Sequence, residues 1–271
     1  MNRVCVIIPQ YGKEEYTRKC IEFTKKNAGI DIDILVVDDG SDIPFQPKPC
    51  VWDEETRRAT IDDVNILRIE KNSGFTNATN QGILWCGDRY EYVLTLNNDT
   101  EPEPDFLKHL VESADADPSI GIIGSVRRYP NTNQYETCGA DLIRGHQWLA
   151  EDLKGDGPIE VNWFPICSGL LRMSMVREIG LLDKRFRNHC SDADYCITAK
   201  IHKWKVMIHP KSVVVHHLSV TTTANNINVG NDQRLFVEKL ACLDYAKLMK
   251  QVPLDMENKT YGKLEFSVET R

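Results

Sequence analysis

Two apolar segments of this chain each break off into acidic and amide side chains, and this pattern constrains the fold more than any other feature. Asp31–Ser41 ends in Asp-Asp-Gly-Ser, and Tyr92–Thr100 ends in Asn-Asn-Asp-Thr. Short apolar runs that stop in this way are typical of buried parallel strands, and ligands of such sheets bind beyond the carboxyl ends. Carboxylates brought together there repel one another unless a cation or a donor-rich ligand joins them. We therefore expect a polar cleft that holds a metal ion, a polar ligand or both.

The first 125 residues alternate between patterns typical of strands and patterns typical of helices. Strands are predicted at residues 3–8, 32–37, 64–69, 92–96 and 121–126, and helices at residues 14–27, 76–85 and 104–115. Pro9 is expected to stop the first strand, and residues 42–63 are expected to form a long polar surface connection. The alternation predicts an α/β fold with a doubly wound, mostly parallel central sheet and helices on both faces.

The alternation weakens beyond residue 127. Further strands are predicted at residues 169–173 and 213–216, and further helices at residues 174–179, 192–202 and 232–250. The last helix carries an apolar stripe that Lys239 and Lys247 interrupt, so it is expected to be amphipathic. The residues from Met256 onward are expected to be loosely held.

Composition and charge narrow the classes of function. The chain has 271 residues and a formal net charge of −7, whereas nucleic-acid-binding proteins usually carry a basic face. Its nine cysteines form no Cys-x-x-Cys pair, as expected for reduced thiols in a cytosol. No run approaches the ~20 apolar residues of a membrane span, and the first residues lack the pattern of a signal peptide. We expect a soluble cytoplasmic protein that binds no nucleic acid and contacts a membrane at most peripherally.

Several short motifs follow one another in a characteristic order and spacing. They are Val6-Ile-Ile-Pro9, Val36-Val-Asp-Asp-Gly-Ser41, Asn72-Ser-Gly-Phe75, Leu96-Asn-Asn-Asp-Thr-Glu-Pro102, Ser168-Gly-Leu-Leu-Arg172, Ser191-Asp-Ala-Asp194 and His216-His217. Over residues 4–221 the chain resembles the inverting glycosyltransferases of family 2, and most of all their rhamnosyltransferase-type branch. The resemblance implies the nucleotide-diphospho-sugar transferase fold, also called the glycosyltransferase A-type fold.

The resemblance also implies a reaction and a division of the chain. A hexose or deoxyhexose would pass from a nucleoside-diphosphate sugar of the UDP or dTDP type to a hydroxyl group of a glycan or glycolipid, as in polysaccharide biosynthesis. A divalent cation, Mn²⁺ or Mg²⁺, is the expected cofactor. Residues 1–125 would form the nucleotide-sugar-binding half and residues 126–225 the acceptor-binding and catalytic half of the same domain. Residues 226–271 would form a C-terminal helix and tail.

On the donor side, the resemblance assigns the nucleobase to the second acidic residue of the Asp-Asp-Gly-Ser motif, whose carboxylate would accept a hydrogen bond from a uracil or thymine ring N–H. The alternative is an Asx-type turn, which fits Asp38 well. The helix that follows Gly74 would favour an anion at its N-terminus. Gln10 and Tyr11, which follow the first strand, would flank the base, and an ordinary loop is the alternative for these two residues. The expected donor-binding residues are Pro9, Gln10, Tyr11, Asp39, Asn72, Gly74, Asn97 and Asn98.

For the metal, the resemblance points to Asp99, which corresponds to the family's Asp-x-Asp motif. A carboxylate suits a hard divalent cation that bridges the donor diphosphate. Asn97 stands at the first acidic position of the motif, which lowers the negative charge and favours weaker metal binding. His216, in preference to His217, would complete the metal shell. The alternatives are a turn ahead of Pro102 for Asp99 and a buried core histidine for His216.

For catalysis, the resemblance assigns the general base to Asp192, and Ser191 replaces the glutamate usual beside it. Acidic side chains also stabilise the first turn of a helix through its macrodipole, which is the alternative for Asp192 and Asp194. Gly169, Asp194 and Trp163 are expected on the acceptor side, with core packing as the alternative for the tryptophan.

Two other functions stay open on the sequence alone. A sugar-1-phosphate nucleotidyltransferase shares the sheet, but it needs a glycine-rich loop with an arginine after the first strand, and Pro9–Lys13 lacks one. A non-catalytic protein that binds sugar nucleotides or glycans would account for Ser191 and Asn97, where acidic residues of the family are replaced.

Overall fold

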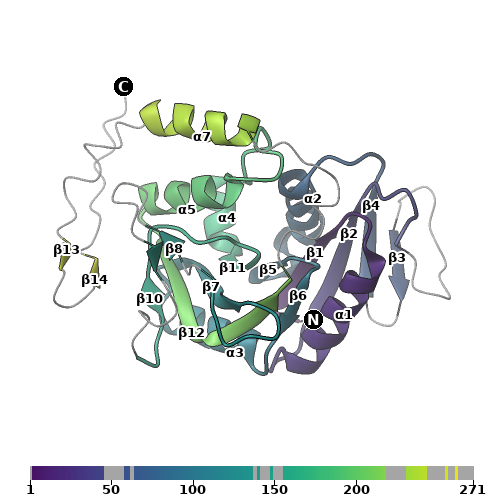
Figure 1. Ribbon diagram of the computed structural model, residues 1–271, viewed down its shortest axis with the longest axis horizontal. Coiled ribbons are helices and arrows are strands. Elements are labelled where there is room, and N and C mark those ends of the chain that lie inside the picture. Colours follow the sequence, from purple (N-terminus) through teal and green to yellow (C-terminus); the bar gives the residue numbers. More distant parts are fainter. Residues whose placement is uncertain are drawn as a thin grey trace.

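A central mixed sheet organises the part of the chain that the computed structural model describes (Figure 1). The described residues are 2–45, 58–61, 64–136, 139–140, 147–148, 155–217, 230–242, 254–255 and 260–261. The strands of the sheet are β1 (Val4–Gln10), β2 (Asp33–Asp39), β3 (Arg58–Ile61), β4 (Val64–Ile69), β5 (Tyr92–Leu96), β6 (Thr100–Pro102), β7 (Ile120–Arg128), β10 (Ile159–Glu160), β11 (Ser168–Arg172) and β12 (Lys205–His216). They lie in the order β10-β12-β7-β11-β5-β1-β2-β4-β3, and β6 pairs with β12.

The remaining elements are helices and two short strand pairs. The helices are α1 (Glu14–Asn27), α2 (Phe75–Cys86), the short 3₁₀ helix η1 (Gly87–Arg89), α3 (Phe106–Ala116), α4 (Met173–Ile179), α5 (Ser191–Ile201) and α7 (Gly230–Cys242). The strand pairs are β8 (Gly139–Ala140) with β9 (Gln147–Trp148), and β13 (Leu254–Asp255) with β14 (Thr260–Tyr261).

The parallel strands bring several carboxyl ends to one edge of the sheet. β1 lies between β2 and β5 and is parallel to both, and β4 continues the parallel set beyond β2. β7 and β12 form a second parallel pair, and β11 runs antiparallel between β5 and β7. The residues that follow β1, β2, β5 and β12 therefore face one region, as expected for an open α/β sheet.

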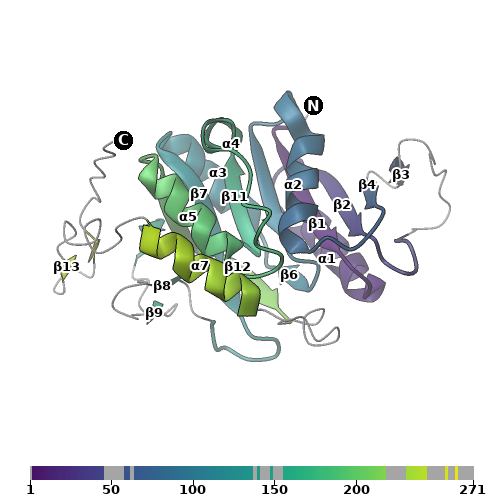
Figure 2. The same cartoon turned by 90° about the horizontal axis from the view of Figure 1, so that it is seen from above.

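Alternate side chains of β1 enter two separate cores, one on each face of the sheet. Cys5 and Ile7 pack in a cluster that includes residues of α2, α4 and α5, whereas Val4, Val6 and Ile8 pack in a cluster with residues of α1 and α3. α7 lies alongside α5 (Figure 2). The predicted doubly wound α/β sheet with helices on both faces is confirmed.

The prediction that Pro9 stops the first strand is wrong. β1 continues through Pro9 to Gln10, and Pro9 lies opposite Val37 of β2. The pairing of β1 with β5 ends at Ile7. Pro9 lacks an N–H group, but β1 therefore loses no hydrogen bond to β5 at this position. The longer strand carries Gln10 to the edge of the sheet where the site forms.

Three other strands differ from the sequence-based expectation. β12 begins at Lys205 instead of residue 213, because a bulge between His209 and Val213 interrupts the alternation that marks a strand. β3 lies within the connection expected at residues 42–63, most of which is outside the described residues. β6 has three residues, which is too short for a periodic signal. The predicted helical residues beyond Cys242 also lie outside the described part.

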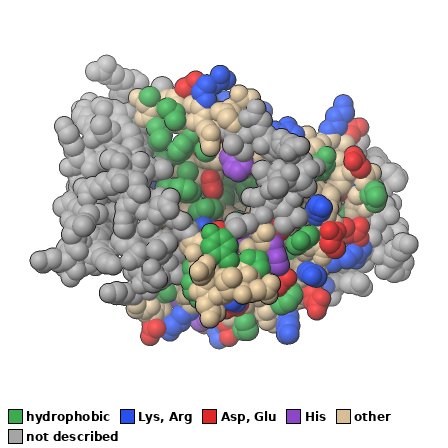
Figure 3. All heavy atoms as spheres, viewed as in Figure 1, with side chains coloured by type: hydrophobic (Ala, Val, Ile, Leu, Met, Phe, Trp, Pro, Cys, Tyr) green, Lys and Arg blue, Asp and Glu red, His purple; other side chains and the backbone are tan. Residues whose placement is uncertain are grey.

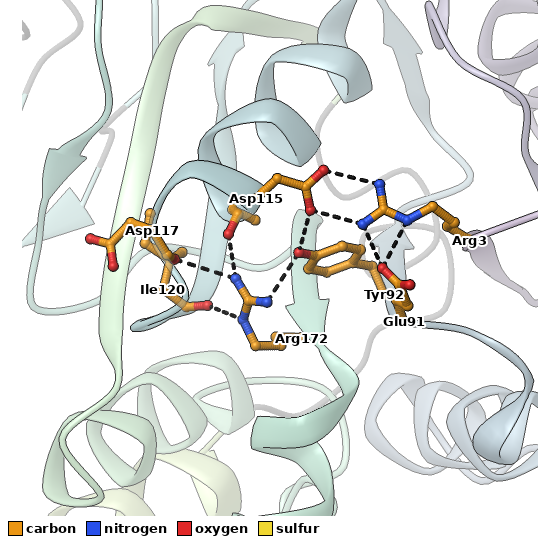
Figure 4. Close-up of polar contacts among 8 residues, drawn as sticks. Arg3, Glu91, Tyr92, Asp115, Asp117, Ile120 and Arg172 are labelled. Atoms are coloured by element: carbon orange, nitrogen blue, oxygen red, sulfur yellow. Dashed lines mark hydrogen bonds and ion pairs between the residues drawn. The ribbon is translucent and has the colours of Figure 1, made fainter.

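The opposite edge of the sheet is closed by a polar network (Figure 4). Arg172 donates hydrogen bonds to the backbone oxygens of Ile120 and Ala114 and to the hydroxyl of Tyr92. The Tyr92 hydroxyl donates to Asp115, which also pairs with Arg3. A cation beside the last carbonyls of α3 satisfies groups that the helix leaves without partners. This edge holds the strand starts and α3 together.

Candidate active site

A cavity of about 190 Å³ lies at the carboxyl ends of the parallel strands. Figure 3 shows that one face of the molecule is hollowed near its middle, where apolar side chains surround an acidic one and a histidine lies beside it. The residues that line the cavity are Pro9, Gln10, Tyr11, Asp39, Asn72, Gly74, Phe75, Ala78, Asn97, Asn98, Asp99, Asn188, His189 and His216. All of the sequence-predicted donor and metal residues are in this set.

The two aspartates at the end of β2 have different surroundings. Asp38 accepts hydrogen bonds from the backbone N–H groups of Ser41 and Phe45 and from Arg68, so the turn interpretation is confirmed for Asp38. Asp39 lines the cavity and is buried, with 3% of its surface exposed. The strand alternation turns the two side chains to opposite faces, and only the second reaches the cleft.

The carboxylate of Asp39 organises the turn that precedes α2. Its oxygens accept hydrogen bonds from Asn72 Nδ2 (3.0 Å), Ser73 N (2.9 Å), Ser73 Oγ (2.6 Å) and Gly74 N (2.8 Å). Burial raises the pKa of Asp39 despite these hydrogen bonds, which favour the charged form. Because each oxygen already accepts two hydrogen bonds, a nucleobase N–H would have to share Asp39 with this turn. The Ser73 hydroxyl can rotate away and release one acceptor position.

Gly74 is needed at the start of α2 for both conformation and space. Its φ angle of +92° is one that side chains disfavour, and a Cβ atom there would lie 2.5 Å from Arg187. The next two N–H groups are also satisfied within the protein, Phe75 N by Asn188 Oδ1 and Thr76 N by Arg187 O. These N–H groups are therefore occupied, and the expected attraction of an anion to this helix start is weakened.

The polar side chains on the α1 side of the cavity are fixed by one threonine. Thr17 Oγ1 donates to Gln10 Oε1 at 2.8 Å and accepts from Asn98 Nδ2 at 3.0 Å. The Gln10 amide also donates to Ser41 Oγ at 2.9 Å. All four side chains are buried, so their amide groups are held in one orientation at the cavity wall.

Asp99 and His216 meet at the cavity, although 117 positions separate them in the chain. His216 Nε2 lies 3.4 Å from Asp99 Oδ1, and His216 Nδ1 lies 2.8 Å from Glu136 Oε1. Burial alone would lower the pKa of His216, but the contacts with Asp99 and Glu136 outweigh it and raise the pKa to about 9. His217 points elsewhere and pairs with Glu101 at 3.0 Å.

The Asp99–His216 pair has the chemistry of a partial metal site. His216 Nε2 is buried and makes no well-aligned hydrogen bond among the described residues; its contact there is the 3.4 Å ion pair with Asp99 Oδ1, so a metal could replace its proton between the two side chains. Glu136 holds the other ring nitrogen, as carboxylates commonly do behind metal-bound histidines. Within the described ranges, no group of three or more His, Cys, Asp or Glu side chains could hold a metal ion. One carboxylate and one imidazole fit a divalent cation only if the rest of its ligands come from outside these two side chains.

Asp192 lies in the first turn of α5 and does not line the 190 Å³ cavity. Its carboxylate accepts a hydrogen bond from Ala193 N at 2.8 Å. Burial raises the pKa of Asp192, and the hydrogen bond from Ala193 N and the positive charge of Arg127 partly oppose that rise. In the chain, Asp192 follows the cavity-lining His189 by three residues.

The three residues expected on the acceptor side are apart from the cavity lining. Gly169 is buried in β11 between β5 and β7. Trp163 is partly buried and packs against the core cluster that includes residues of α2, α4 and α5. Asp194 makes an ion pair with Lys239 of α7 at 2.6 Å. Burial raises the pKa of Asp194, although Lys239 favours its charged form.

Sequence reasoning missed Asn188, His189 and Glu136. Asn188 and His189 lie three and two residues ahead of Ser191, so their closeness in sequence to the Ser191-Asp-Ala-Asp motif was the signal that could have identified them. Glu136 lies in a stretch of the sequence that has no periodic pattern. Its carboxylate bridges Arg127 (2.8 Å) and His216, and only the folded chain reveals this contact.

Comparisons with solved structures show a shared fold. The structure of GalNAc-T7 with UDP, GalNAc and Mn²⁺ superposes with a TM-score of 0.62 at 14% identity, covering 79% of this chain and 43% of that one. Residues 1–349 of S. aureus TarS, solved alone and with UDP, superpose with a TM-score of 0.54 at 15% identity, covering 79% and 60%. The sheet therefore has the glycosyltransferase A-type arrangement. None of the described helices is both long and apolar enough to span a bilayer.

Sequence comparison identifies the family. The chain is 24% identical over 144 residues to the Bacillus subtilis (strain 168) protein named "Putative glycosyltransferase EpsH", and the match covers 53% of this chain and 39% of that protein. The chain thus matches about two fifths of that relative's length. Residues 5–140, which are half of the chain, match the model of glycosyl transferase family 2, and the chain belongs to this family.

Proposed function

We propose that this protein is an inverting glycosyltransferase that moves a sugar from a nucleoside-diphosphate donor to a hydroxyl group of a glycan or glycolipid. The observation that carries the proposal is that residues from the ends of β1, β2, β5 and β12 line one shared cavity. The family and the fold support it as well. A rhamnosyltransferase-type specificity, with a deoxyhexose donor, is the narrower form of the proposal.

The nucleoside would bind on the side of Asp39 and Tyr11. Asp39 would accept a hydrogen bond from the ring N–H of uracil or thymine while Ser73 releases one acceptor position. A UDP-type donor is supported by the structural neighbours, because GalNAc-T7 was solved with UDP, GalNAc and Mn²⁺ and TarS was solved with UDP. The fixed amides of Gln10 and Asn98 would shape the adjoining wall.

Asp99 and His216 would hold a divalent cation, Mn²⁺ or Mg²⁺, through one carboxylate oxygen and one imidazole nitrogen. When bound, such a cation supplies Lewis-acid stabilisation of the negative charge that develops on a departing diphosphate. Asn97 in place of an acidic residue keeps the negative charge of this wall low, which favours modest metal affinity.

Asp192 would remove the proton from the acceptor hydroxyl as that hydroxyl attacks the sugar. Burial disfavours the charged carboxylate, so a proton moves to Asp192 more readily than to an exposed aspartate. Attack opposite the leaving diphosphate inverts the configuration at the anomeric carbon. Gly169, Trp163 and Asp194 are proposed for the acceptor side of this arrangement.

The test compares Asp192→Asn with the wild type. The variant should bind UDP with unchanged affinity but lose turnover of UDP- or dTDP-sugars by a factor on the order of 10²–10⁴, the usual contribution of a general base. Asp88→Asn is the matched control, because Asp88 is exposed and pairs only with Arg177 at the surface in the described structure. Wild-type turnover in Asp192→Asn would overturn the assignment of the base.

The same enzyme should lose activity in acid. A base works only when ionised, and the raised pKa of Asp192 means that protonation begins above the ordinary value of 3.8. Turnover in the wild type should therefore fall as the pH drops through that pKa, and kcat/KM measured from pH 4 to 8 shows it. A flat profile in this range would contradict Asp192 as the base.

A non-catalytic sugar-nucleotide-binding protein is the second candidate, because Ser191 and Asn97 stand where the family carries acidic residues. Donor hydrolysis with and without Mn²⁺ separates the two. Nucleotide binding without any turnover across a panel of UDP- and dTDP-sugars would favour the binding protein.

A further inference from the structure

The carboxylate of Asp232, in the helix α7, binds the backbone of the loop Arg187–His189, which forms part of the cavity wall. Asp232 of α7 has 5% of its surface exposed. It accepts hydrogen bonds from three successive backbone N–H groups, those of Arg187 (3.0 Å), Asn188 (2.8 Å) and His189 (2.9 Å). Three N–H groups that converge on one carboxylate make a strong and well-defined contact.

The other side of this loop is attached to the donor-binding turn. Asn188 Oδ1 accepts from Phe75 N at 3.1 Å, and Arg187 O accepts from Thr76 N at 3.2 Å, both at the start of α2. Arg187 Nη2 donates to Asn72 Oδ1 at 2.5 Å. The loop thus connects α7 to the start of α2. The turn before α2 is itself held by Asp39, which lines the cavity.

Two residues of the loop contribute to the cavity wall. Asn188 and His189 both line it, and α5, with the proposed base, begins two residues after His189. His189 Nε2 is buried and has no hydrogen-bond partner among the described residues. A small shift of this loop would move a cavity wall and the start of the catalytic helix together.

The rest of α7 is anchored on both sides of the same loop. Lys239 pairs with Asp183 at 3.0 Å and with Asp194 at 2.6 Å, and the rings of Phe236 and Phe186 meet edge to face. These anchors hold α7 against the protein, whereas Asp232 contacts the loop backbone itself. Docking of the helix and placement of the loop can therefore be separated by mutation.

We propose that Asp232 is a positioning residue for the nucleotide-binding site. It fixes the loop Arg187–His189, and through it the places of Asn188, His189 and the first turn of α2. The C-terminal helix is then a part of the donor site. This inference rests on the proposed function, because it takes the cavity to be the nucleotide site.

The experiment measures UDP affinity in the presence of Mn²⁺ by calorimetry, together with thermal unfolding. Asp232→Asn removes the charge and turns one acceptor into a donor that faces N–H groups. The Kd for UDP should rise about tenfold, the effect of misplacing one hydrogen-bonding contact, and the KM for the donor should rise more than kcat falls. Arg234→Ala, on the exposed side of the same helix, should leave both unchanged.

A second comparison separates positioning from stability. Lys239→Met breaks the other polar anchor of α7, so it should lower the unfolding temperature while the Kd for UDP stays near that of the wild type. Asp232→Glu keeps the charge but is one methylene longer, so it should also weaken UDP binding. It replaces Asp232→Asn as the test if that variant does not fold.

The outcomes distinguish the two proposals. Wild-type UDP affinity in Asp232→Asn, or in Asp232→Glu if the former is unfolded, would overturn the positioning role. An equal loss of UDP affinity in Lys239→Met would also overturn it, because docking of α7 alone would then explain the effect. A wild-type protein that binds neither UDP nor dTDP would overturn the proposed function and this inference together.

Discussion

At the scale of single residues, one histidine contacts two acidic side chains. His216 lies between Asp99 and Glu136, and Glu136 is itself paired with the buried Arg127. The pKa of Glu136 is lowered because His216 and Arg127 favour its charged form more than burial opposes it. The arrangement fixes the ring of His216 so that Nε2 faces Asp99.

Glu136→Gln is expected to weaken Mn²⁺ binding. The amide keeps the size of the side chain but loses the charge that orients His216, and loss of such a partner typically costs 10–100-fold in metal affinity. Titration of Mn²⁺ followed by electron paramagnetic resonance measures it. Glu101→Gln is the matched control, since it removes the same contact from the neighbouring His217. Equal Mn²⁺ affinity in both variants would exclude Glu136 from this role.

At the scale of elements, the site depends on how closely α2 lies against the sheet. α2 follows the turn that Asp39 organises, and it crosses β1 and β2 at Gly82. A Cβ atom on Gly82 would lie 2.5 Å from Ile7 Cγ2 and 3.2 Å from Val37 Cγ2. A glycine within a helix is intrinsically unfavourable, so close packing accounts for it here.

Gly82→Ala should destabilise the protein by about 1–3 kcal/mol, the usual cost of overpacking a core. Alanine is the better helix former by about 1 kcal/mol, so packing and propensity oppose each other, and we expect packing to prevail. Urea unfolding measures the difference. Gly157→Ala, where a Cβ would meet nothing within 4 Å, is the control. A neutral or stabilised Gly82→Ala would mean that α2 can move away from the sheet at little cost.

At the scale of the whole molecule, the two ends of the parallel strands have different roles. The carboxyl edge holds the cavity with Asp39, Asp99 and His216. The amino edge holds the Arg3 and Arg172 network, in which Arg172 reaches from β11 to the end of α3 (Figure 4). Stability and ligand binding should therefore respond to different mutations.

Arg172→Met is expected to lower the free energy of unfolding by about 1–3 kcal/mol, because it leaves backbone carbonyls of α3 and β7 without their donor. The Kd for UDP should stay at the wild-type value, since the cavity lies at the other edge. Chemical denaturation and calorimetry measure the two quantities. Arg177→Met, which loses only an exposed ion pair, controls for removal of a positive charge. A matching loss of UDP affinity in Arg172→Met would show that the two edges are coupled.

The local sequence determined the longer strands of the sheet, most helices and the polar residues at the strand ends, but not the short strands β3, β6 and β10. Apolar periodicity and turn residues act over a few positions, so the helix Glu14–Asn27 and the strand Val64–Ile69 were predicted to the residue. The polar ends of β2 and β5 predicted a shared cleft in the same way, since a parallel sheet brings carboxyl ends together, and the family resemblance then selected Asp39 and Asp99.

Only the tertiary structure decided which distant side chains meet. Glu136 contacts His216 across 80 positions, and Asp232 contacts the loop at Asn188 across 44. Neither contact has a periodic signal, because each depends on the path of the whole chain between the two residues. Local patterns specify elements, whereas contacts between distant loops and helix ends arise only after the elements have packed.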